Sequence, residues 1–137
     1  MRGNDRLMRT IVVGLGVQGK KRLAVAGLDV VATVDTVHPD AQYRSVRDVS
    51  VSDYDAALVC TPDDPKVDLL SYLLENGKHV LVEKPLLARD GSELEKLARL
   101  ARENGVTCYT AYNHRFEPHF MRMRETISAG RLGRVYC

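Results

Sequence analysis

Gly14, Gly16 and Gly19 have the spacing Gly-x-Gly-x-x-Gly, and they follow a short β-branched run over residues 10–13. In such a loop the first glycine permits a tight turn, the second lets a pyrophosphate approach the backbone, and the third permits close contact between a helix and a sheet. A helix behind the loop would present free N–H groups and its positive dipole end to the phosphates. The spacing therefore predicts a dinucleotide-binding loop made of Gly14, Gly16, Val17, Gln18 and Gly19.

A carboxylate, Asp35, ends the next apolar run, about 20 residues after Gly14, which is the spacing expected of a ribose-binding acid. Such a carboxylate accepts hydrogen bonds from both ribose hydroxyls and repels a 2′-phosphate. No lysine or arginine immediately follows Asp35, so we expect NAD as the cofactor in preference to NADP. The alternative is that Asp35 is a solvated acid at the end of a strand.

A lysine, Lys84, lies between Glu83 and Pro85, directly after the apolar run of residues 79–82. Open parallel sheets bind their ligands at the carboxyl ends of the strands, and proline ends the strand ladder because it has no N–H. An ammonium group there would stabilise negative charge that develops on an alcohol oxygen as hydride leaves for a nicotinamide. The alternative is a solvated charge at a strand end.

The other reactive side chains have simpler interpretations. Lys20, Lys21 and Arg22 follow the glycine loop and could contact phosphate, but a solvated outer helix face explains them more simply. Cys60 and Cys108 lie in apolar runs, where free cysteines behave as small buried hydrophobes. No Cys-x-x-Cys motif or Cys/His cluster is present, so no metal site is predicted.

Strands and helices alternate along the chain, with predicted strands over residues 10–13, 29–35, 54–60, 78–82 and 106–109. Predicted helices cover residues 18–26, a segment from the acidic cap at residues 63–65 to residue 75, residues 90–103, and residues 116–128. Residues 36–53 are polar and predict irregular chain with at most a short helix. Each connection is long enough for a right-handed crossover. We therefore predict an α/β fold with a doubly wound, mostly parallel sheet of the Rossmann type.

Composition excludes several classes of function. The 137 residues suit one domain, and a formal charge of +2 favours no polyanionic partner such as nucleic acid. The apolar stretches are far shorter than the roughly 20 residues of a membrane span. No signal-peptide pattern opens the chain, so we expect a cytoplasmic protein without membrane partners.

The glycine loop, Thr61-Pro62, the stretch over residues 77–85 and the stretch over residues 112–116 together resemble the glucose–fructose oxidoreductase/inositol dehydrogenase (Gfo/Idh/MocA) family. The resemblance runs over essentially the whole chain. It implies NAD(P)-dependent oxidation or reduction of a secondary alcohol on a sugar, cyclitol or nucleotide sugar. It assigns residues 1–115 to a dinucleotide-binding domain and residues 116–137 to a linking helix and the first strand of a C-terminal antiparallel α+β domain, which the chain lacks.

The resemblance also implies roles for individual residues. It makes Lys84 the catalytic lysine, which contacts the reacting hydroxyl and the nicotinamide ribose, and the peptide before Pro85 is often cis in the family. Glu83 would orient the lysine or the cofactor ribose. Thr61 and Pro62 would line the adenosine and nicotinamide side of the cleft.

Three further residues follow the predicted fifth strand and are candidates for substrate binding. The resemblance places Arg115 near the substrate entrance, with Asn113 beside it, whereas His114 could either donate to substrate or be structural. The chain departs from the family at Lys66, where the family often has histidine.

The leading hypothesis is therefore the cofactor domain of a sugar-type dehydrogenase, inactive by itself and part of a homo-oligomer. The alternative is a standalone, non-catalytic dinucleotide-binding or redox-sensing module. S-adenosylmethionine-dependent methyltransferases share the glycine loop and the acid after the second strand. That chemistry has no need of Lys84 at the fourth strand, so it is the third interpretation.

Overall fold

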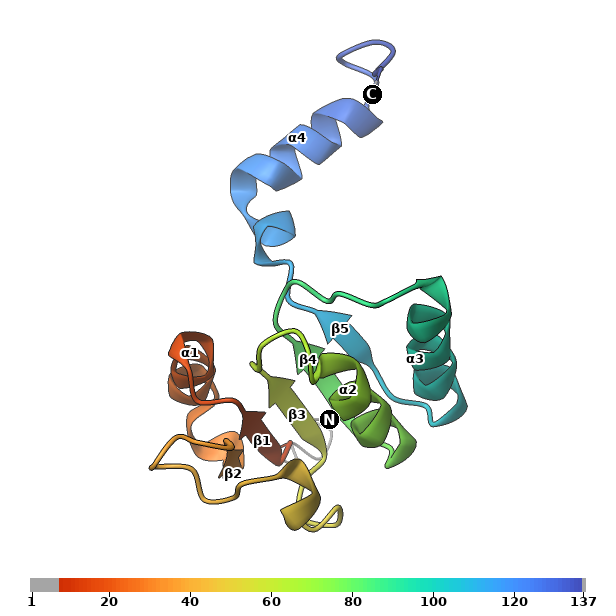
Figure 1. Ribbon diagram of the computed structural model, residues 1–137. Helices are drawn as coiled ribbons and strands as arrows, with labels where there is room; N and C mark the ends of the chain where they lie inside the picture. Colours follow the sequence, from red (N-terminus) through yellow and green to blue (C-terminus); the bar gives the residue numbers. More distant parts are fainter. Residues whose placement is uncertain (1–7, 137) are drawn as a thin grey trace, which may run out of the picture.

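A five-stranded parallel sheet forms the centre of the computed structural model, which describes residues 8–136 (Figure 1). The strands lie in the order β2-β1-β3-β4-β5, and every neighbouring pair is parallel. The bounds are β1 (Thr10–Val13), β2 (Val30–Val34), β3 (Ala56–Val59), β4 (His79–Val82) and β5 (Cys108–Thr110). The predicted Rossmann-type fold is therefore confirmed, with each strand within two residues of its expected position at either end.

The connecting helices lie on both faces of the sheet. They are α1 (Val17–Ala26), α2 (Lys66–Glu75) and α3 (Gly91–Glu103), and α2 packs against α3. The chain moves one way along the sheet from β1 to β2 and the opposite way from β3 through β4 to β5. Right-handed crossovers in opposite directions place their helices on opposite faces, so α1 covers one face while α2 and α3 cover the other. This reversal of direction occurs between β1 and β3, where such folds bind ligands.

The core consists of the inward residues of the strands and one stripe of α2. Ile11 and Val59 are fully buried, as are Leu70, Leu73 and Leu74 of α2. Burying a leucine side chain contributes about 1.5–3 kcal/mol, and strands covered by helices on both faces must be apolar throughout. On the face that α2 covers, the sheet is thus anchored through this helix, which contacts β4.

Two predicted helix starts have different outcomes. Asp90 caps α3 as expected, because its carboxylate accepts hydrogen bonds from the N–H groups of Ser92 and Glu93. The acidic cap expected for α2 is wrong. Pro65 is the residue before that helix and no side chain caps it, because the Asp63 carboxylate instead accepts a hydrogen bond from Lys66 Nζ.

The segment between β2 and β3 contains one short 3₁₀-helix, η2 (Val46–Asp48), as predicted, and another, η1 (Gly27–Asp29), precedes β2. Ser45 and Asp48 cap η2 reciprocally through their side chains. Tyr43, shortly before η2, forms a bridge with Val34 at the end of β2. The segment therefore holds η2 near the carboxyl end of β2.

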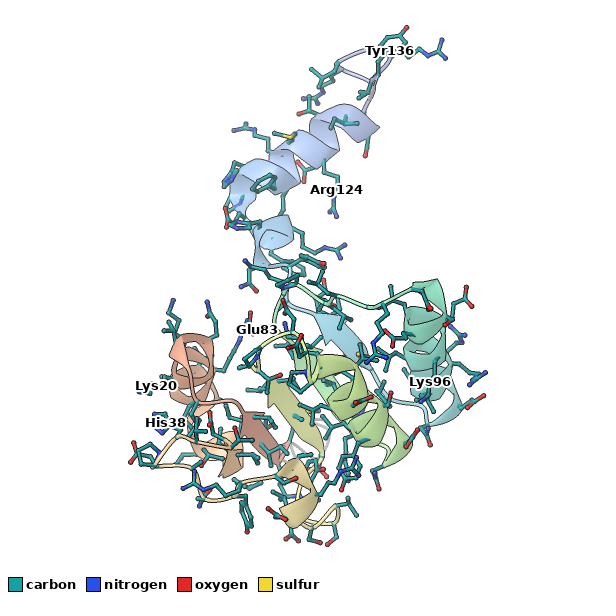
Figure 2. The ribbon with its side chains drawn as sticks, viewed as in Figure 1. Lys20, His38, Glu83, Lys96, Arg124 and Tyr136 are labelled. Carbon is teal, nitrogen blue, oxygen red and sulfur yellow. The ribbon has the colours of Figure 1, made fainter. Side chains whose placement is uncertain are left out.

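The C-terminal part projects away from the sheet (Figure 1). It comprises η3 (Asn113–Phe116) and α4 (Pro118–Ser128), and Figure 2 shows Arg124 and Tyr136 on it. The apolar side chains of this part are exposed, Phe116 on η3 and Phe120, Met123 and Ile127 on α4.

The strand expected over residues 133–137 is not formed by residues 133–136, and Cys137 lies outside the described residues. A strand is stable only when a neighbour completes its hydrogen-bond ladder, and no described strand lies beside this segment. Among residues 8–136, no helix is both long and apolar enough to cross a bilayer.

Replacing Leu70 by alanine tests the role of α2 in the core. We expect Leu70→Ala to lower the free energy of unfolding by about 2–5 kcal/mol, because the side chain is fully buried and leaves a cavity. Leu28→Ala is the matched control, since Leu28 is 98% exposed, and it should change stability by no more than about 0.5 kcal/mol. Urea unfolding measures the unfolding free energy of both variants. Equal losses for Leu70→Ala and Leu28→Ala would contradict this description of the core.

Candidate active site

The carboxyl ends of four strands form one continuous edge of the sheet. The backbone N–H of the residue that follows each of these strands donates to the carbonyl oxygen at the end of a neighbouring strand. The N···O distances are 2.7–2.8 Å, and the pairs are Gly14 with Val34, Cys60 with Val13, Glu83 with Val59, and Ala111 with Val82. These bonds extend the ladder by one residue past each strand. The glycine loop and the Glu83–Pro85 segment therefore leave the sheet at the same edge, as the sequence predicts.

The three glycines have separate steric roles. Gly14 has a φ of +92°, and a Cβ there would lie 2.9 Å from the carbonyl atoms of Cys60. A Cβ on Gly19 would lie 1.7 Å from Gly14 O, so α1 can approach the strand only with glycine at this position. A Cβ on Gly16 would meet no atom within 4 Å. The backbone at Gly16 thus faces open space at the start of α1, where a phosphate can approach.

A cavity of about 640 Å³ opens along this edge, within the range of small-molecule sites. It joins five of the predicted site residues: Gly14, Gly16, Asp35, Thr61 and Pro62. Val17, Gln18 and Gly19 belong to the loop and first turn of α1 and do not line the cavity. Glu83 and Lys84, with residues 113–115, also lie outside its lining, so the cavity has the position expected for the adenosine half of a dinucleotide and is called the adenosine cavity.

Asp35 holds the glycine loop and the chain after β2 together. Its Oδ2 accepts a hydrogen bond from Leu15 N at 2.7 Å, and its Oδ1 accepts from Val37 N and His38 N, both at 2.9 Å. Burial, the largest influence, acts to raise the pKa of this carboxyl, but the three N–H donors together bring its pKa below the ordinary value. A carboxylate has about four acceptor positions, so one remains for a ribose hydroxyl.

Thr61 presents an unsatisfied hydroxyl. Its Oγ1 is buried and has no hydrogen-bond partner among the described residues, although Thr61 lines the cavity. Buried hydroxyls are normally paired, so this one is suited to a ligand hydroxyl or phosphate oxygen. Cys60, beside it, is not a reactive thiol, because burial raises its pKa to about 11.

Two arginines that were not predicted lie at the outer wall of the cavity. Arg44 Nη1 donates to the carbonyl oxygens of His38 at 2.7 Å and Asp35 at 3.3 Å. The Arg47 guanidinium lies 4.3 Å from the centre of the Tyr72 ring, a cation–π contact. Both lie in the irregular segment between β2 and β3, where no periodic pattern indicates which side chains turn inward.

Glu83 is buried and pairs with Arg22 of α1, whose Nε lies 2.6 Å from Glu83 Oε1. Figure 2 shows Glu83 at the ligand edge of the sheet. The prediction that Arg22 belongs to a solvated helix face is therefore wrong, whereas Lys20 and Lys21 are exposed. The spacing contains a signal for this contact, because residues three apart share a helix face and Gly19 already faces the sheet.

Lys84 is exposed directly after Glu83, at the ligand edge, and the Lys84–Pro85 peptide is cis, as the resemblance implies. Lys66 approaches this turn from α2 and donates to Pro85 O at 2.6 Å. Its side chain is only 2% exposed. Lys66 lies one helical turn before Leu70, and this spacing indicates the buried face.

The candidate substrate residues, Asn113, His114 and Arg115, are exposed in η3. His114 Nδ1 lies 2.5 Å from Glu117 Oε1, and Arg115 Nη1 donates to the Tyr109 hydroxyl at 3.0 Å. Asn113 precedes them on the same short helix. They lie on the Lys84 side of the edge, beyond the fifth strand, and not in the adenosine cavity. No group of three or more metal-ligating side chains occurs within residues 8–136.

The residues present fit a dinucleotide. The open backbone at Gly16 admits a pyrophosphate, the cavity takes an adenosine, and Thr61, whose buried hydroxyl has no partner among the described residues, lines its wall. The remaining acceptor position of Asp35 suits the ribose.

Known proteins match this description. The model of a family described as "Oxidoreductase family, NAD-binding Rossmann fold" matches residues 8–112. Inositol 2-dehydrogenase of Rhizobium meliloti is 33% identical over 86 residues, which are 63% of this chain and 26% of that protein. Myo-inositol dehydrogenase Hyg17 of Streptomyces leeuwenhoekii is 38% identical over 91 residues, 66% of this chain and 28% of that protein. The chain thus spans about a quarter of the length of these relatives.

A solved structure agrees over nearly the whole chain. The WlbA dehydrogenase of Bordetella pertussis, in complex with NADH and UDP-GlcNAcA, superposes with a TM-score of 0.82. The match covers 97% of this chain and 43% of that chain, at 24% identity. At this identity the likeness establishes the fold.

Alanine substitutions at two glycines of the loop should separate folding from binding. Gly19→Ala drives a methyl group into Gly14 O, so we expect a loss of about 3 kcal/mol in unfolding free energy. Gly16→Ala should change stability by less than about 1 kcal/mol, because Gly16 is extended and its Cβ is unobstructed. It should nevertheless weaken dinucleotide binding at least about tenfold, since the methyl group occupies the phosphate approach. Unchanged binding by Gly16→Ala would contradict the loop's assignment.

Asp35 should make stability depend on pH in acid. Because its pKa is lower in the folded chain than the ordinary 3.8, its contribution is complete above 3.8 and is lost as the pH falls through the folded value. Asp35→Asn should therefore be less stable than the parent at about pH 6 and closer to it at about pH 2.5. Asp40→Asn, at a side chain 85% exposed, is the control and should show no such change. Urea unfolding at both pH values measures the difference in unfolding free energy between the parent and Asp35→Asn. If this difference is the same at both pH values, the role of the three N–H donors is refuted.

Proposed function

Because the chain belongs to the Gfo/Idh/MocA oxidoreductase family, whose NAD-binding Rossmann fold it has, we propose that its carboxyl-edge site binds NAD for hydride transfer with a secondary alcohol. The observation that carries the proposal is the cavity that runs from the open backbone at Gly16 to Asp35. A glycine loop, a helix N-terminus and a carboxylate at that spacing are what a pyrophosphate and a ribose require.

Each part of the site has a proposed function. The N–H groups at Gly16, Val17 and Gln18 would hold the pyrophosphate, and Gly14 and Gly19 would permit the close packing that presents them. Asp35 would accept hydrogen bonds from the adenosine ribose, and Thr61 with Pro62 would line the opposite wall. NAD, when bound, supplies the nicotinamide that accepts or returns hydride.

Lys84 is the proposed catalytic residue. Its ammonium group would contact the nicotinamide ribose, and it would donate to the substrate oxygen and stabilise negative charge there. Glu83 would act indirectly: its ion pair with Arg22 holds the chain immediately before the lysine. This differs from the expected contact of Glu83 with the lysine or the ribose.

The substrate class is a sugar, cyclitol or nucleotide sugar. This proposal is supported by the inositol dehydrogenases among the relatives and by the UDP-GlcNAcA in the similar solved structure. Asn113, His114 and Arg115 would lie on the substrate side, because they follow the strand next to Lys84.

The wider organisation is also a proposal. Residues 1–115 would be the cofactor domain, and residues 116–137 would link it to a substrate domain. The projection of α4 and its exposed apolar side support this division and a homo-oligomeric assembly. A cytoplasmic location is supported by the free thiols of Cys60 and Cys108.

Calorimetric titration with NADH and NADPH tests the proposal. We expect NADH to bind with a micromolar dissociation constant, about −8 kcal/mol, and NADPH at least about tenfold more weakly. Asp35→Asn should narrow this difference because it removes the charge that repels a 2′-phosphate, whereas Asp40→Asn should leave it unchanged. If neither nucleotide binds the parent chain below about 1 mM, the proposed function is wrong.

A further inference from the structure

A buried lysine outside the adenosine cavity contacts the turn that contains Lys84. Lys66 is the first residue of α2, a position usually open to solvent, yet its side chain is only 2% exposed. Lys66 Nζ lies 2.8 Å from Asp63 Oδ1 and 2.6 Å from Pro85 O. The side chain therefore joins the loop after β3 to the turn after β4.

Burial of an ammonium group is unfavourable unless it is paired and hydrogen-bonded. Asp63 supplies the opposite charge, and its carboxylate is 40% exposed and so remains partly hydrated. The second acceptor is a backbone oxygen that belongs to the residue immediately after Lys84. A shape-matched apolar side chain could fill the same space, but it could not donate to that oxygen.

The turn is also held from its other side. Glu83 N donates to Val59 O at 2.8 Å, and the Glu83 carboxylate pairs with Arg22. Lys84 itself is exposed, and no hydrogen bond or ion pair with another of residues 8–136 holds its side chain. Its direction is consequently set by the two neighbouring residues, Glu83 and Pro85, through Arg22 and Lys66 respectively.

We propose that Lys66 is a positioning residue for Lys84: by its hydrogen bond to Pro85 O it fixes the turn from which the Lys84 ammonium reaches the nicotinamide half of the cofactor. This inference rests on the proposed function of Lys84. It assigns a role in the active site to a residue at which the chain departs from its family, and it distinguishes that role from packing of α2 alone.

A double-mutant cycle with NADH tests this role. Lys66→Met should weaken NADH binding by about tenfold in the parent chain and by less than about twofold in the Lys84→Met background, because the loss acts through Lys84. Binding of ADP, which lacks the nicotinamide half, should change by less than about twofold in every variant. Equal losses of NADH binding in both backgrounds, or equal losses for ADP and NADH, would overturn the proposal.

Lys78→Met is the matched control. Lys78 Nζ also donates to a backbone carbonyl, that of Tyr54 at 2.9 Å, but it precedes β4 at the opposite end of the sheet. It should lower stability without changing the ratio of NADH to ADP affinity. If Lys78→Met changes that ratio as much as Lys66→Met does, a general loosening of the sheet explains the effect and the proposal fails.

Folding is monitored by circular dichroism. If Lys66→Met is unfolded, the cycle is repeated with Lys66→Gln, which keeps an N–H donor on a shorter side chain. A loss of about threefold that disappears in the Lys84→Met background supports the proposal, and an additive loss overturns it. Two other outcomes would refute the proposed function itself. In the first the parent chain does not bind NADH, and in the second Lys84→Met binds NADH as tightly as the parent does. The inference then fails with it.

Discussion

The close contact between α1 and the first turn of the glycine loop is the constraint on which the rest of the carboxyl edge depends. Only the absence of a side chain at Gly19 allows the helix to lie against Gly14 O, where an added Cβ would be 1.7 Å away. That approach aims the N-terminus of α1 along the edge of the sheet, and it brings the same helix face over β1 and β3. Arg22, one turn further along, reaches Glu83 for this reason.

Two pairs of charges then hold the backbone around Lys84. Arg22 with Glu83 and Lys66 with Asp63 bring together two cations and two anions, so the group carries no net charge. Ion pairs of this kind add little net stability, because desolvation offsets most of their attraction. Their contribution here is geometric. They connect α1, the loop after β3 and the turn after β4, three segments that are far apart in the sequence.

The sequence predicted the fold well because the governing signals are local. The β-branched run over residues 10–13 and the glycine spacing each depend on a few adjacent residues. The position of Asp35 follows from the same kind of spacing. These signals place the glycine loop, Asp35 and Lys84 at one edge without any knowledge of side-chain contacts.

The contacts that were missed depend on tertiary structure. Arg22 and Lys66 were expected to be solvated or were left without a role, because charged side chains on helices usually face water. Lys66 is buried and Arg22 is only partly exposed because each pairs with a carboxylate, Asp63 and Glu83 respectively, and the helix pattern alone does not indicate these pairs. Arg44 and Arg47 were missed because residues 36–53 have no period from which an inward side could be inferred. The strand expected at residues 133–136 needed a neighbour that no described residue supplies.

The three N–H bonds accepted by Asp35 have a consequence for how cofactor preference can evolve. The carboxylate that faces the proposed ribose position also ties Leu15 to the chain after β2. A replacement that merely removes the negative charge would free the nucleotide pocket for a phosphate and loosen the glycine loop in the same step. A change of cofactor preference from NAD to NADP by a single substitution at Asp35 would therefore lower the stability of the chain. Further substitutions around Leu15 and Val37 would be needed to restore it. Asp35 thus contributes to two properties, the preference between nucleotides and the stability of the glycine loop.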